Sequence, residues 1–85
     1  MNYACMKSEI EMLETMIAKE KERQASICDY ICECESHVLK PESTDEIEKF
    51  NEARYYADEA ERAELEKKLI ANKIEYLEKQ LALFK

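Results

Sequence analysis

The densest cluster of chemically versatile side chains in this sequence lies between Cys28 and His37. Its members are Cys28, Asp29, Cys32, Glu33, Cys34, Glu35 and His37. Thiolates, imidazoles and carboxylates are the ligands of zinc, and a structural zinc site needs four of them in tetrahedral arrangement. Cys28 and Cys32 are one helical turn apart and could share an ion, but Cys34 points in another direction. We therefore expect ordinary helix cysteines and no metal site.

The residues needed for catalysis or for binding a cofactor are not grouped in this sequence. His37 is the only histidine, and its acidic neighbours supply no nucleophile for it to activate. Glycine is absent, so the chain cannot form a glycine-rich phosphate loop. We expect no catalytic residue and no cofactor, and the sequence indicates a protein that is not an enzyme.

The first half of the chain has apolar residues at alternating spacings of three and four, which is the signature of one helix face. The members of this seam are Tyr3, Met6, Ile10, Leu13, Ile17, Glu20, Gln24, Ile27, Ile31, Cys34 and Val38. Only Glu20 and Gln24 are polar among them. The spacing predicts a helix over about residues 3–38, roughly 54 Å long at 1.5 Å per residue.

The only proline of the sequence, Pro41, marks a break between two helices. Proline disfavours helical geometry in the residue before it, so the turn is expected at about residues 39–43. Ser43 and Glu46 have the spacing of a capping box, which predicts a second helix over about residues 44–84. Its seam is expected to begin with Ile47 and Phe50, to pass through a tract of alanines and to end in a leucine-rich stretch.

A connection this short makes the two helices antiparallel neighbours. Counted outward from Pro41, residues whose numbers total about 82 should face each other, which places Ile17 near Leu65. The predicted fold is an all-α, coiled-coil-like hairpin of two antiparallel helices that forms a single domain over residues 1–85.

A second apolar stripe suggests that one hairpin is not the whole assembly. Two helices enclose no core of their own, and small domains of this kind commonly need a partner. The stripe is offset from the seam by roughly a third of a turn. The expected oligomer interface consists of Leu65, Leu69, Tyr76 and Leu83, together with Met12 and Met16, which flank the seam of the first helix. We expect a homodimer, a four-helix bundle in which each hairpin tip lies beside the termini of the other copy.

Charge is distributed unevenly along the chain, whose formal net charge is −7. Residues 1–28 carry −1, residues 29–66 carry −9 and residues 67–85 carry +3. The acidic middle segment forms the tip of the predicted hairpin, and such a surface repels phosphate backbones, so direct nucleic-acid binding is not expected. The carboxylates expected to contact a partner with a basic surface are Glu48, Glu52, Asp58, Glu59 and Glu61.

Two functions fit these patterns. The first is a small oligomeric coiled-coil adaptor or assembly factor that binds other proteins through its apolar stripes. The alternative is a small acidic inhibitor that mimics nucleic acid and blocks a basic groove on a nucleic-acid-binding enzyme, for example one encoded by a phage or mobile element. The longest apolar runs are about four residues, far short of the roughly twenty needed to span a bilayer. We expect no membrane association and a cytoplasmic protein with reduced cysteines.

Overall fold

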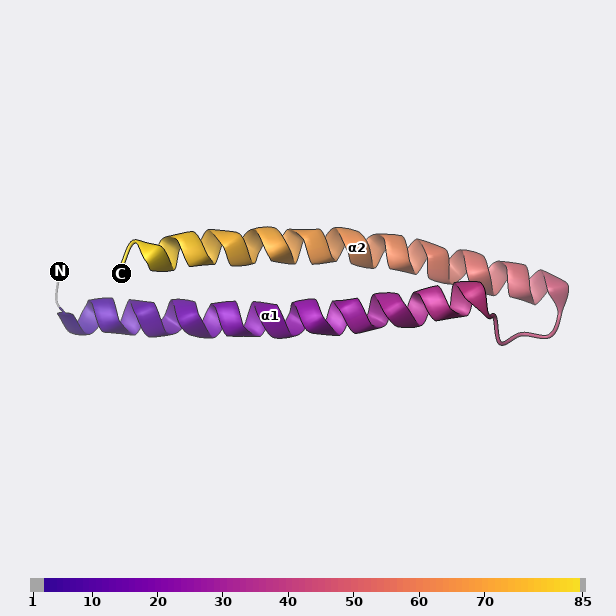
Figure 1. Ribbon diagram of the computed structural model, residues 1–85, viewed down its shortest axis with the longest axis horizontal. Helices are drawn as coiled ribbons and strands as arrows, with labels where there is room; N and C mark the ends of the chain where they lie inside the picture. Colours follow the sequence, from indigo (N-terminus) through magenta and orange to yellow (C-terminus); the bar gives the residue numbers. More distant parts are fainter. Residues whose placement is uncertain (1–2, 85) are drawn as a thin grey trace.

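Two long helices account for nearly all of the chain that the structure describes. The computed structural model describes residues 3–84, with side chains from residue 6 onward. Helix α1 spans Tyr3–Leu39 and helix α2 spans Glu46–Ala82. They pack antiparallel as a hairpin, with the start of α1 beside the end of α2 (Figure 1), in a rod of 66 × 15 × 12 Å. The predicted all-helical hairpin is confirmed, and residues 3–84 contain no strand.

The helix ends lie close to the positions expected from the sequence. Helix α1 ends at Leu39 against an expected 38, and α2 runs over Glu46–Ala82 against an expected 44–84. Most residues between the ends are Glu, Lys, Ala, Leu and other strong helix formers, so nothing interrupts either helix. Neither helix of the described chain contains a stretch long and apolar enough to cross a membrane.

The core is a narrow apolar seam between the helices, and it is densest in the terminal half of the rod. Its main cluster joins residues of both helices: Leu13, Ile17, Ile70, Ile74 and Leu77, with Ile27, Leu81 and Phe84 packed against them. Further along the rod the buried residues are Ile31, Cys34 and Ala63. The alternating seam predicted for α1 therefore does face α2 from Met6 onward, and its first member, Tyr3, lies outside the described side chains.

The pairing register differs from the one predicted. In the contacts Arg23–Glu66, Tyr30–Glu59 and His37–Glu52 the two residue numbers total 89, not about 82. Ile17 consequently packs with Ile70 and Ile74, while Leu65 is exposed. The prediction assumed a symmetric turn centred on Pro41. Instead, residues 40–45 pass beyond the end of α1 before α2 begins (Figure 1), which shifts α2 along α1 by about one heptad.

This shift also corrects the predicted start of the α2 seam. Ile47 and Phe50 were expected to face α1, but they are 72% and 65% exposed. The first turns of α2 project past Leu39, the last residue of α1 (Figure 1), so there is no opposing helix for them to pack against. The paired part of α2 begins with Glu52, at the level of His37.

The cap of α2 differs from the predicted capping box as well. Asp45 is the N-cap, and its carboxylate accepts a hydrogen bond of 3.0 Å from the backbone N–H of Ile47. The Ser43 hydroxyl does not cap the helix and instead donates to Glu52 at 2.9 Å. The predicted role of Ser43 was wrong: its hydroxyl is engaged by Glu52 further along α2, and the helix begins two residues later than expected, with Asp45 as its cap.

Candidate protein-interaction surfaces

The predicted second stripe of α2 lies outside the seam and is open to solvent. Its four large apolar members, Leu65, Leu69, Tyr76 and Leu83, are between 62% and 78% exposed. The neighbouring residues Ile70, Ile74 and Leu77 are buried against α1, so the two stripes occupy different faces of one helix. An isolated exposed leucine is common, but large apolar residues that recur on one face over about five helical turns are typical of a contact surface.

Met12 and Met16, the two methionines of α1 predicted to belong to the oligomer interface, lie on the same side of the hairpin as this stripe. Met16 is 36% exposed and lies one helical turn before Glu20, and Met12 lies one turn before Met16. On α2, Leu69 and Tyr76 lie one turn on either side of Lys73 in the same way. Because Lys73 reaches across to Glu20 at 3.0 Å, the apolar residues of both helices border the same bridge.

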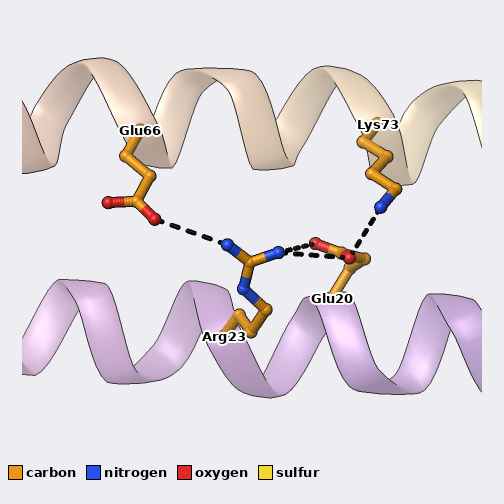
Figure 2. A network of polar contacts seen from close by, with 4 residues as sticks. All are labelled: Glu20, Arg23, Glu66 and Lys73. Atoms are coloured by element: carbon orange, nitrogen blue, oxygen red, sulfur yellow. Dashed lines mark hydrogen bonds and ion pairs between the residues drawn. The ribbon is translucent and has the colours of Figure 1, made fainter.

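The bridge itself is a network of four charged residues that joins the helices at mid-seam (Figure 2). Glu20 is 7% exposed, and its carboxylate accepts hydrogen bonds from Lys73 at 3.0 Å and from Arg23 at 3.3 and 3.4 Å. Arg23 also reaches Glu66 on α2 at 3.4 Å. The hydrogen bond from Lys73 lowers the pKa of Glu20, against the opposing effect of burial. A buried carboxylate is thus kept charged and fully bonded.

The five acidic residues predicted to form the partner-binding tip fall into two groups. Glu48, Asp58 and Glu61 are exposed and form no ion pair with the part of the chain that the structure describes. Glu52 and Glu59 are half-buried and engaged in contacts within the hairpin. Only the first group presents unneutralised charge to solvent, so the available acidic surface is smaller than the sequence suggested.

Glu52 closes the hairpin at its turn. Its carboxylate accepts hydrogen bonds from the backbone N–H of Glu42 at 2.8 Å and from the Ser43 hydroxyl at 2.9 Å, and it lies 3.4 Å from Nδ1 of His37. The Glu42 N–H is the main cause of a lowered Glu52 pKa. The His37 ring stacks on Tyr56 with centroids 4.1 Å apart, and burial raises the pKa of that tyrosine. His37 therefore stabilises the turn.

Glu59 plays a similar role one heptad further along α2. It accepts a hydrogen bond of 3.0 Å from the Tyr30 hydroxyl on α1, and Arg62 lies 3.8 Å from its other oxygen. This bond to Glu59 is the main reason that the pKa of Tyr30 is raised well above its ordinary value of 10.0. The tyrosine and the carboxylate thus link the two helices in the tip half, where the alanines of α2 provide little apolar contact.

An apolar surface at the tip was not predicted from the sequence. Leu39, Ile47 and Phe50 are all strongly exposed there. Leu39 also lines a shallow groove of about 360 Å³, together with Glu35, Val38, Ala57 and Ala60. The small alanine side chains leave this space next to the end of α1. The sequence did contain a signal for this surface, because Ile47 and Phe50 follow the loop directly. If that loop extends past the end of α1, the residues after it have no helix opposite them.

The cysteine cluster is spread over different environments. Cys28 is half-buried, Cys32 is exposed and Cys34 is completely buried in the seam, and all three are unpaired. Among the side chains from residue 6 to residue 84, no three His, Cys, Asp or Glu groups converge in a way that could hold a metal ion. The fourth cysteine, Cys5, lies outside the described side chains.

Comparisons with known proteins add no relationship to this geometry. No protein-family model matches the chain, and searches of curated proteins and of solved structures find no match. Function is consequently inferred from the surfaces described above.

Proposed function

We propose that this protein is a non-enzymatic protein–protein interaction module, a small oligomeric coiled-coil adaptor or assembly factor of the cytoplasm. The observation that carries the proposal is the exposed apolar stripe of Leu65, Leu69, Tyr76 and Leu83 on the terminal half of α2. Burial of apolar area is the main driving force of protein association, and this stripe remains exposed after the hairpin has formed its own seam. A homodimer that forms a four-helix bundle is the assembly that covers it most simply.

Features of the described hairpin also support a binding role without turnover. Its titratable groups with altered pKa, Glu20, Glu52, Tyr30 and Tyr56, all contact the opposite helix or the turn, where they stabilise the hairpin. Structural ion-pair networks alter pKa values in this way without catalysis. The hollows found between the helices are shallow grooves, whereas small-molecule sites generally enclose most of their ligand.

A second candidate function is favoured by the tip. Glu48, Asp58 and Glu61 are exposed and unneutralised within a segment of net charge −9. Such a surface suits a basic groove, so the alternative is an acidic inhibitor that occupies the nucleic-acid-binding site of an enzyme, such as one encoded by a phage or mobile element. Both functions can coexist in one molecule, because the stripe begins at Leu65 and runs toward the C-terminus, whereas Glu48, Asp58 and Glu61 precede it on the tip side of α2.

The experiment that tests the proposal measures mass in solution by light scattering for the wild type and for Leu69→Glu. The wild type should have twice the 10.1 kDa of one chain, and the variant should be monomeric with unchanged helical circular dichroism. The matched control is Ala71→Glu, which introduces the same charge at an exposed position of α2 outside the stripe and should leave the dimer intact. A monomeric wild type at high micromolar concentration would contradict self-association.

The two candidate functions are separated by a capture experiment with three baits. These are the wild type, Leu69→Glu, and a triple charge reversal in which Glu48, Asp58 and Glu61 become lysine. A protein lost with the reversal and released by moderate salt supports the acidic inhibitor. A protein that is lost with Leu69→Glu and withstands salt supports the adaptor. Glu52 and Glu59 are left unchanged because they stabilise the hairpin.

A further inference from the structure

The exposed stripe of α2 follows a regular spacing, and two polar residues occupy the positions between its large apolar residues. Alternating steps of four and three keep a row of side chains on one face of a helix and form the seam of coiled coils. The row that follows these steps consists of Leu65, Leu69, Asn72, Tyr76, Lys79 and Leu83, and we call it the outer stripe. All six positions are exposed on the described hairpin.

The outer stripe is symmetric about the level of Ile74. If a second α2 lies antiparallel with that level in common, Leu65 meets Leu83 of the second copy and Leu69 meets Lys79 of the second copy. The alkyl stem of the lysine then covers the leucine while its ammonium group reaches solvent. The same contacts recur on the other side of the axis, as a two-fold interface requires.

The centre of the outer stripe is polar and adds specificity to this register. Asn72 meets Tyr76 of the second copy on each side of the axis, and the short asparagine side chain leaves room for the tyrosine ring. The asparagine amide and the tyrosine hydroxyl are also able to hydrogen-bond. A displaced register would instead bury the amide against leucine without a partner, which costs free energy. One asparagine in a coiled-coil seam selects register in this way, at some cost in stability.

The rest of α2 does not offer this match. Continued toward the tip, the same spacing passes through positions that are mainly polar: Arg62, Asp58, Tyr55, Asn51 and Glu48. A dimer overlapping along its whole length would place Leu69 and Tyr76 of one copy against these charged and polar residues of the other. In such a dimer the leucine and tyrosine would bury little apolar surface, and the charged groups would lose hydration without gaining a partner.

We propose that the protein pairs through α2 with a second copy of itself, antiparallel and centred at the level of Ile74, so that only the terminal halves overlap. This inference rests on the proposed function and specifies the geometry of its self-association. The two acidic tips then project in opposite directions, and the assembly becomes a rod with one binding tip at each end. It replaces the expectation that each tip lies beside the termini of the other copy.

Two further features agree with this arrangement. Met12 and Met16 border the bridge at Lys73 on the same side as Leu69 and Tyr76, so they lie on the flank of α1 that is nearer to the second copy. The overlapping segments 1–28 and 67–85 carry −1 and +3, whereas residues 29–66 carry −9. Partial overlap therefore brings together the two least charged halves and keeps the strongly acidic halves apart.

The first test is the length of the dimer, measured by small-angle X-ray scattering of the full chain. One hairpin is 66 Å long, and a dimer that overlaps completely keeps nearly that length. With the axis at Ile74, each tip lies roughly 45 Å from the axis at 1.5 Å per residue, which gives a dimer of about 90 Å. A dimeric mass with a maximum dimension near that of one hairpin would overturn the proposal and leave the proposed function intact.

The second test uses Lys79, the one charged residue of the outer stripe. In the proposed register it faces Leu69 of the second copy, so Lys79→Leu should lower the dimer dissociation constant about tenfold, and Lys79→Glu should raise it. Lys7→Leu, the same change at an exposed position of α1 outside the stripe, is the control and should have little effect. If Lys79→Leu weakens or does not alter the dimer, the register is wrong. If the wild type shows no dimer, the proposed self-association fails as well.

Discussion

A carboxylate inside an apolar seam needs partners, and Glu20 has two of them. Lys73 and Arg23 bond both of its oxygens, and Arg23 continues to Glu66 (Figure 2). Such a pair adds little net stability over an apolar contact, but it penalises any register that separates the charges. A polar seam residue was recognisable from the heptad pattern alone. Its partners were not, because they depend on which residues of α2 lie at the same level.

Glu52 provides a test of the turn at the scale of one residue. Glu52→Gln keeps a single acceptor oxygen and turns an amide NH₂ toward the donors of Glu42 and Ser43. At neutral pH we expect the midpoint of thermal unfolding, followed by circular dichroism, to fall by several degrees. Glu48→Gln, the same change at an exposed position, should have little effect.

The pH dependence of this difference has a definite sign. Because the pKa of Glu52 is lower in the folded protein than its ordinary 4.5, its stabilisation is complete above that value and is lost as the pH falls through the folded pKa. The gap between wild type and Glu52→Gln should therefore close on acidification. A gap that stays constant well below pH 4.5 would show that the charge of Glu52 does not matter.

At the scale of the helices, the sequence was sufficient for the type and the approximate ends of both elements. Heptad spacing, one proline and an unbroken series of helix formers are local signals, and they gave α1 and α2 to within two residues at each end. These local signals did not predict the register in which the two helices pair. It depends on the path of residues 40–45 and on the match of Leu13 and Ile17 with the buried residues of α2, which are properties of the folded pair.

Two identical substitutions on α2 test the register directly. Ile70→Ala removes a buried side chain from the core and should lower the free energy of unfolding in urea by about 2 kcal/mol, the low end for isoleucine because the seam is narrow. Ile47→Ala makes the same chemical change on the overhanging turn and should alter stability by less than about 0.5 kcal/mol. Equal losses for the two variants would favour the register centred on Pro41.

At the scale of the whole molecule, the surfaces divide along the rod. The exposed stripe of Leu65, Leu69, Tyr76 and Leu83 runs along α2 toward the termini, whereas residues 29–66 carry the net charge of −9 and include the exposed Leu39, Ile47 and Phe50 at the tip. The charge map was readable from the sequence. The distinction between exposed carboxylates and those bonded within the hairpin could not be predicted from the sequence, because Glu52 and Glu59 differ from Glu48 only in what lies opposite them.

This division predicts how salt affects self-association. Each copy carries −7, so two copies repel one another, and in a dimer joined by apolar terminal halves no strong acid–base contact offsets that repulsion. Raising the salt from about 0.05 M to about 0.5 M shortens the Debye length from roughly 14 Å to roughly 4 Å. The dissociation constant, measured by sedimentation equilibrium, should therefore fall by about threefold or more.

Complete overlap of the two hairpins predicts the opposite response. In that arrangement the acidic tip of one copy lies beside residues 67–85 of the other, which carry +3, and salt weakens the contact by screening the attraction. Leu69→Glu serves as the control, since it should stay monomeric at every salt concentration and so exclude aggregation caused by salt alone. A dissociation constant that rises with salt would place the acidic and basic segments in contact. The partial overlap centred on Ile74 would then be wrong, although the protein would still be a dimer.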